Sequence, residues 1–294
     1  MRVFDLHCDT LTRCMQKDEP LAQASGHVSL ERGGALERWG QVFAVYVPDT
    51  LRGQAAAAYA NQALDFFDSQ RSEIERVCTP VLAIENGNAL MGDLRRLDEF
   101  YARGVKIITL TWNGANELGY GAHCGGTPGL TDFGKAAVRR MFELGIIPDV
   151  SHLNEAGFWD VAGLAAAHGE PFWATHSNCS EIQPHRRNLS DEQLRAVFAC
   201  GGLAGLNLYT EFLGGAGTAE DAARHLAHMM SLSGEDHAAL GSDFDGCDVH
   251  PTLAGIERME YLNAELSRLG FTAAQRKKFF WSNAAKTLAI FPRI

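Results

Sequence analysis

Eight short runs of apolar and β-branched residues, separated by segments with helical spacing, constrain the fold of this chain more than any other feature. Their apolar residues are continuous rather than alternating, as is typical of parallel strands buried on both faces. Eight strand-then-helix units in 294 residues predict an α/β fold, a closed (β/α)8 TIM barrel that forms one domain over residues 1–294. The expected strands are Val3–Cys8, Val42–Val47, Thr79–Ile84, Lys106–Thr111, Ile146–Val150, Phe172–Thr175, Leu203–Leu208 and Ala238–Gly241.

The segments between these runs contain residues typical of helix starts and helix ends, and apolar residues at helical spacing. The clearest are an apolar face through Leu64 and Phe67, a stop at Gly145, a capping box that begins at Ser190 and an N-cap at Thr218. An open, doubly wound sheet could also hold eight strands. However, no G-x-G-x-x-G follows the first run, which argues against a dinucleotide-binding version of that fold.

Charge and composition exclude several classes of partner. The net charge of -10 disfavours nucleic acid, and no apolar run approaches the roughly 20 residues that cross a bilayer. The first residues lack the layout of a signal peptide, so we expect a cytoplasmic protein. The seven cysteines are scattered, with no C-x-x-C pair, and are expected to be free thiols. A homodimer is expected on general grounds alone.

Residues with reactive side chains gather where the expected strands end. In a parallel barrel all carboxyl ends meet at one mouth, which is where barrel active sites lie. The sequence therefore predicts a polar site at that mouth. The strand-end segments are His7-Cys8-Asp9, Glu85-Asn86, Asp149-Val150-Ser151-His152, His176-Ser177-Asn178 and Asp243-Phe244-Asp245-Gly246.

The composition of this predicted site suits metal ions. His7 and Asp9 lie two residues apart on a strand, so both side chains point the same way. An isolated H-x-D is more often a hydrogen-bonded pair, but here Glu85, His152 and His176 add two imidazoles and a second carboxylate. A carboxylate in the position of Glu85 is costly unless it is paired or bridges cations. Two divalent ions about 3.5–4 Å apart could share a hydroxide that attacks an amide or ester.

The remaining polar residues have more than one interpretation. Asp243 could move a proton between water and a leaving amine, or it could orient a histidine. Of Arg186 and Arg187, one guanidinium could hold a substrate carboxylate, and Arg186 is expected to be an ordinary surface residue. His225 and His228, three residues apart on an expected outer helix, are interpreted as structural.

These motifs resemble the membrane (renal) dipeptidase family of binuclear zinc peptidases, including its bacterial members. The resemblance extends from one end of the chain to the other. It rests on Asp5-Leu6-His7-Cys8-Asp9-Thr10, Gly40-Gln41-Val42-Phe43-Ala44-Val45-Tyr46, Ile84-Glu85-Asn86-Gly87, Ile108-Thr109-Leu110-Thr111, Gly129-Leu130-Thr131-Asp132-Phe133-Gly134, Asp149-Val150-Ser151-His152, Thr175-His176-Ser177-Asn178, His185-Arg186-Arg187-Asn188-Leu189-Ser190-Asp191, Gly241-Ser242-Asp243-Phe244-Asp245-Gly246 and Ser282-Asn283-Ala284-Ala285.

The resemblance implies a metallo-dipeptidase with two Zn2+ ions per chain and a hydroxide bridging them. It implies that His7 and Asp9 ligate the first zinc and that His152 and His176 ligate the second. Glu85 is implied as the bridging carboxylate at the catalytic centre. Arg187 is implied to bind the substrate's C-terminal carboxylate. Asp243 is implied to lie beside the reacting water and the substrate amine. Family members often tolerate a D-residue on the C-terminal side of the dipeptide.

One position departs from the family pattern. Many members have a histidine after the Leu-Thr of the fourth strand, where it supports the oxyanion, but this chain has Trp112. Indole offers a single N–H donor. Oxyanion support is therefore expected from Trp112, Asn113, His123 or zinc alone. The departure leaves open an alternative function, a related amide hydrolase that acts on N-acyl amino acids or β-lactams.

Overall fold

The computed structural model describes residues 1–124 and 128–288. Across these residues the strands form one parallel, seven-stranded sheet in the order β5-β4-β3-β2-β1-β7-β6. Their apolar residues are buried, as the continuous apolar runs predict. The strands are β1 (Arg2–Cys8), β2 (Arg38–Tyr46), β3 (Thr79–Glu85), β4 (Val105–Thr109), β5 (Ile147–Asp149), β6 (Ala204–Leu206) and β7 (Ala238–Leu240).

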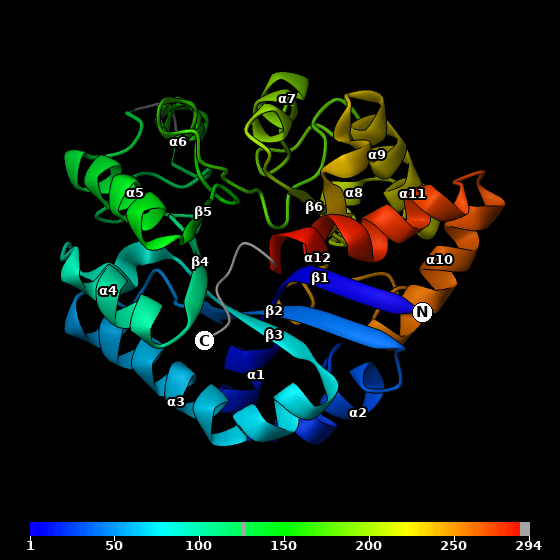
Figure 1. Cartoon of the computed structure of the whole chain (residues 1–294), viewed down its shortest axis with the longest axis horizontal. Coiled ribbons are helices and arrows are strands. Elements are labelled where there is room, and N and C mark those ends of the chain that lie inside the picture. Colours follow the sequence, from blue (N-terminus) through cyan, green and yellow to red (C-terminus); the bar gives the residue numbers. More distant parts are fainter. Residues whose placement is uncertain (125–127, 289–294) are drawn as a thin grey trace.

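Helices surround the curled sheet, and the larger ones lie around its outside in Figure 1. Gly145 ends α5 in the left-handed conformation, and Ser190 forms the expected capping box of α7. None of the described helices is both long and apolar enough to cross a membrane. The helices are α1 (Thr10–Lys17), α2 (Leu30–Gly33), α3 (Gln54–Val77), α4 (Arg95–Ala102), α5 (Asp132–Leu144), α6 (Glu155–His168), α7 (Asp191–Ala199), α8 (Thr210–Leu213), α9 (Ala219–Ser231), α10 (Met259–Arg268), α11 (Ala273–Lys277) and α12 (Asn283–Leu288).

The expected strand Phe172–Thr175 does not form a regular strand in the described structure. Trp173 makes one parallel bridge to Asp149 and Ala174 makes one to Ala204, so the segment spans the space between β5 and β6. The ladder stops there because the next N–H groups turn to side chains. The N–H of Thr175 donates to Asp149 Oδ1 at 2.9 Å, and the next N–H donates to a serine hydroxyl.

Two buried carboxylates join neighbouring strands and the segments that follow them. Asp5 on β1 accepts hydrogen bonds from the side chain of Gln41 on β2 and from the backbone and hydroxyl of Ser242 after β7. Asp149 on β5 accepts hydrogen bonds from the hydroxyl of Thr109 on β4 and from the backbone and hydroxyl of Thr175. Since an unpaired buried carboxylate is costly, these bonds fix the strand ends relative to one another.

His225 on α9 is a buried structural histidine, as expected. Its Nδ1 accepts the N–H of Cys179 at 3.2 Å, and its Nε2 donates to the Leu213 carbonyl at 3.1 Å. This pattern requires the neutral ring. Burial lowers the pKa of His225 to about 4. All seven cysteines are free, also as expected.

We therefore predict an acid-sensitive contribution from His225. Its pKa is depressed in the folded state, so its stabilising effect is complete above about pH 6.5 and is lost as the pH falls toward 4. In urea unfolding, the stability gap between the wild type and His225→Gln should shrink by about 2 kcal/mol between pH 7 and pH 5. An identical gap at both pH values would contradict this.

Candidate active site

A cavity of about 650 Å³ opens at the carboxyl ends of the strands. Its wall includes Asp9, Glu85, His152, Arg187 and Asp243, all of which are buried residues. His7 and His176 lie in the same group of side chains and are 1% and 0% exposed. The structure thus brings together all seven residues that the sequence analysis assigned to the site.

Glu85 lies at the centre of the imidazole groups. Its Oε2 is 3.5 Å from His7 Nε2, and its Oε1 is 3.0 Å from His152 Nε2 and 3.7 Å from His176 Nε2. Two possible ligand sets share this carboxylate. The ligand atoms of His7, Asp9 and Glu85 lie within 4.8 Å of one another, as do those of Glu85, His152 and His176.

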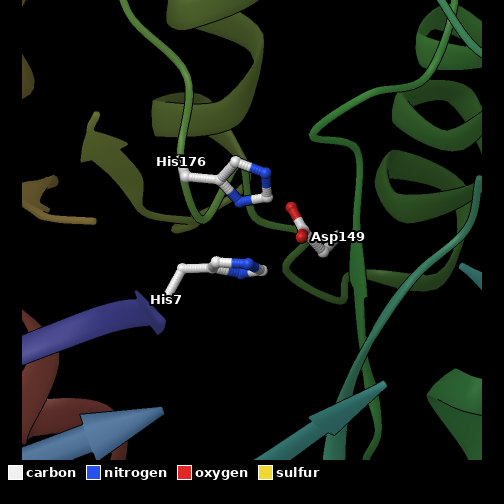
Figure 2. A group of neighbouring side chains, drawn as sticks. All are labelled: His7, Asp149 and His176. Atoms are coloured by element: carbon white, nitrogen blue, oxygen red, sulfur yellow. The ribbon is translucent and has the colours of Figure 1, made fainter. Parts of the chain in front are cut away.

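A third group at this end of the sheet is His7, Asp149 and His176, drawn in Figure 2. The two imidazole rings lie next to each other, with centroids 3.9 Å apart. Asp149 comes from a separate strand, and its oxygens already accept four hydrogen bonds, from Thr109 Oγ1, Thr175 Oγ1, Ser151 N and Thr175 N. We therefore assign it a supporting position rather than a ligand position.

The donor set fits zinc, with imidazole nitrogens and carboxylate oxygens. Within the described part of the chain, His7 Nε2, His176 Nε2 and Asp9 Oδ1 are buried and have no hydrogen-bond partner. Buried polar atoms are rarely left unpaired, and these three lie around Glu85. His152 Nδ1 is 2.9 Å from Asn113 Oδ1, and its Nε2 faces Glu85 Oε1 at 3.0 Å.

Electrostatics separate the pKa values of the neighbouring groups. Burial lowers the pKa of His7, but the Glu85 and Asp9 carboxylates outweigh it and raise that pKa well above its ordinary value. Burial lowers the pKa of His152 to about 4, with a further contribution from Arg187. Burial raises the pKa of Glu85, but His7 and His152 outweigh it and hold the value well below normal. Glu85 is thus an anion surrounded by imidazole nitrogens.

Arg187 and Arg186 lie in different environments although they are adjacent. Arg186 is exposed, whereas Arg187 is 4% exposed and lies over the Phe212 ring at 5.3 Å. Burial lowers the pKa of Arg187 to about 10. Its Nε and Nη2 have no partner among the described residues. A buried guanidinium with free donors at a cavity wall is suited to bind an anion.

The segment after β7 brings Asp243 beside the ends of β1. The Asp243 N–H donates to the His7 carbonyl at 3.1 Å, and Asn207 Nδ2 donates to Asp243 Oδ2 at 2.9 Å. Burial raises the pKa of Asp243 to about 6. Asp243 and His152 both have positive φ, 61° and 71°, a strained conformation for residues other than glycine that is often found at functional sites.

The three side chains considered for oxyanion support, Trp112, Asn113 and His123, all line the cavity. The Trp112 and Tyr46 rings pack edge to face, with centroids 5.2 Å apart and an angle of 64° between the ring planes. Asn113 has its carbonyl oxygen committed to His152. The sequence analysis did not anticipate that contact. Asp149 and Thr175 were noted in the sequence as a strand-end carboxylate and as part of a motif, but no role was assigned to either.

A family model described as "Membrane dipeptidase (Peptidase family M19)" matches residues 68–291, more than half of the chain. The chain belongs to this family. It is therefore a peptide-bond hydrolase, and the family implies a metal cofactor. Because the match begins at residue 68, His7 and Asp9 lie outside it. Their assignment depends on their position beside Glu85 in the structure.

Relatives of this M19 chain include uncharacterised and structurally known proteins. A Klebsiella pneumoniae protein from the pqqA 5' region is 36% identical over 75% of this chain and 85% of its own length. A crystal structure of a metallopeptidase called dipeptidase AC superposes with a TM-score of 0.89 at 28% identity, covering 98% of each chain. A Rhodobacter sphaeroides metallopeptidase bound to a phosphinate mimic of L-Ala-D-Ala has a TM-score of 0.88 at 28% identity, covering 98% of this chain and 99% of that chain.

Gly246 provides a test of the site geometry. A Cβ there would overlap the carboxylates of Asp9 and Asp243. We predict that Gly246→Ala lowers kcat/KM for peptide hydrolysis by about a hundredfold, because a displacement of about 1 Å near the reacting groups can cost that much. Gly163→Ala is the matched control, since a Cβ on this α6 glycine meets nothing within 4 Å. Equal activity of the two variants would contradict the prediction.

Proposed function

We propose that this M19 hydrolase is a dipeptidase that uses two zinc ions held on either side of Glu85. His7 and Asp9 would hold one ion, and His152 and His176 the other. The observation that carries the proposal is the single buried carboxylate common to both ligand sets. Zinc ions there would supply Lewis acidity, activating a water molecule and polarising the peptide carbonyl.

The protein's own residues would hold the two ends of a dipeptide. Arg187 has free, buried donors at the cavity wall and binds the C-terminal carboxylate. Asp243 binds the substrate amine and accepts or returns a proton at its carboxylate, for which a pKa of about 6 is suitable. Asn207 orients this carboxylate through Oδ2. A short peptide with both ends free matches this pair of opposite charges.

The C-terminal residue of the substrate can be a D-amino acid. This part of the proposal is supported by the Rhodobacter sphaeroides structure with its phosphinate mimic of L-Ala-D-Ala. We further propose that the sheet and its helices constitute one (β/α)8 domain, with residues 172–175 in the place of the eighth strand. The hydrogen bonds of Trp173 and Ala174 to residues of, or directly beside, β5 and β6 support this assignment.

Metal removal tests the cofactor. The chain as purified with zinc should contain two ions, and a chelator should remove both the ions and dipeptide hydrolysis. Added Zn2+ should restore activity in proportion to the metal bound, measured by elemental analysis beside the turnover assay. Full turnover by protein with no detectable metal would rule out this mechanism.

Arg187→Met tests recognition of the carboxylate. Since a hydrogen bond to a charged group is worth about 1.5–3 kcal/mol, kcat/KM for free dipeptides should fall by about 10- to 100-fold. For the same dipeptides with an amidated C-terminus, the variant and the wild type should be similar. Arg186→Met should behave as the wild type with both. A loss of the same size on amidated substrates would contradict the assignment.

The same assay separates the alternative substrate class. Trp112 stands where many members have histidine, which motivates a related amide hydrolase of N-acyl amino acids or β-lactams. A dipeptidase should need the free amine, so N-acetylated dipeptides should be poor substrates. Faster hydrolysis of N-acetylated dipeptides than of free ones would favour the alternative.

A further inference from the structure

One threonine hydroxyl lies between two histidines that belong to different ligand sets. Thr175 Oγ1 is 2.8 Å from His176 Nδ1 and 3.5 Å from His7 Nδ1. His7 contributes to the set with Asp9, and His176 to the set with His152. Thr175 itself is 1% exposed. Both contacts are to the ring nitrogens that face away from Glu85.

The direction of these hydrogen bonds follows from Asp149. Thr175 Oγ1 lies 2.7 Å from Asp149 Oδ2, and a carboxylate can only accept, so the hydroxyl proton of Thr175 points to Asp149. The hydroxyl is left with two lone pairs, and two ring nitrogens face them. Each Nδ1 must then carry a proton, which leaves Nε2 as the nitrogen of each ring that can ligate a metal.

The backbone of Thr175 is held as firmly as its side chain. Its N–H donates to Asp149 Oδ1 at 2.9 Å. Its carbonyl oxygen packs against Gly205 and Gly241, where any Cβ would overlap that oxygen. These buried contacts fix the position of the hydroxyl, and Asp149, to which it donates, is 0% exposed.

We propose that Thr175 is a positioning residue that sets the tautomer and ring orientation of His7 and His176 together, with Asp149 as its anchor. This proposal rests on the proposed metal centre. It makes affinity for both ions depend on one hydroxyl, because that hydroxyl orients a ligand of each. Polar partners of a ligating histidine typically account for about 10- to 100-fold in metal affinity.

Three variants isolate this role. Thr175→Val keeps the side-chain shape but removes the hydroxyl, and Thr175→Ser restores it. Thr109→Val is the matched control, because Thr109 also donates to Asp149 Oδ2, at 2.6 Å, but makes no hydrogen bond to either histidine among the described residues. Unfolding of each metal-free variant by urea shows whether the fold is retained.

The first measurement is zinc affinity, obtained by titration against a competing chelator. Thr175→Val should bind zinc about 10- to 100-fold more weakly, with both ions affected, while Thr175→Ser and Thr109→Val stay near the wild type. If the wild type binds two ions and Thr175→Val binds them equally well, the inference is wrong and the proposed function stands. If Thr109→Val loses as much affinity as Thr175→Val, the effect belongs to Asp149 and the role given to Thr175 is wrong.

The second measurement is independent of metal. In the metal-free protein labelled with 15N-histidine, NMR should show His7 and His176 protonated on Nδ1 in the wild type. Thr175→Val should shift the neutral ring of His176 toward the other tautomer, change the Nδ1 signal of His7, and leave His152, which is held by Asn113, unchanged. Unaltered His7 and His176 signals in Thr175→Val would overturn the proposal. A wild type that shows this tautomer pattern but binds no zinc would overturn the proposed function alone.

Discussion

A buried carboxylate surrounded by imidazole groups is the interaction on which this site depends. Glu85 is 2% exposed, at the end of a strand with apolar neighbours, where an unpaired charge would be strongly unfavourable. Three imidazole nitrogens lie within 3.7 Å of its oxygens, whereas the neighbouring carboxylate of Asp9 adds further negative charge. The resulting centre has too many acceptor atoms for the hydrogen atoms available, and this excess is what makes it suitable for cations.

The sheet supports this centre through a layer of hydrogen-bonded side chains beneath it. Asp5 and Asp149 each join the ends of neighbouring segments, and each lies close in the chain or in space to a histidine of the site. Asn207 holds Asp243 in place by donating a hydrogen bond to its Oδ2. Because these groups are buried and satisfied, they restrict where the ligands can lie. The geometry at the mouth is thus a consequence of polar contacts between strands as well as of the apolar core.

The location of the site could be predicted from the sequence, because the carboxyl ends of parallel strands lie at the same edge of the sheet. The strand-end positions of His7, Glu85 and His152 follow from apolar runs alone. The helix signals at Gly145 and Ser190 are confirmed as well, and so is the resemblance to the M19 dipeptidases. The cytoplasmic location and the homodimer stay predictions.

The parts that could not be predicted are contacts between residues far apart in the chain. The segment Phe172–Thr175 has the composition of a strand, but the side chain of Asp149 binds the Thr175 N–H and that of Ser151 binds the N–H of the following residue. The sequence pattern does not show that side chains will compete with the neighbouring strands for these N–H groups. The link from Asn113 to His152 has the same origin, since it depends on how two loops meet.

Anomalous X-ray diffraction at the zinc edge, from crystals of the zinc-loaded protein, is the sharpest test of the proposed two-metal centre. We expect two peaks about 3.5–4 Å apart, with Glu85 between them. One peak should lie against His7 and Asp9, and the other against His152 and His176. A single peak, or two peaks without Glu85 between them, would contradict it.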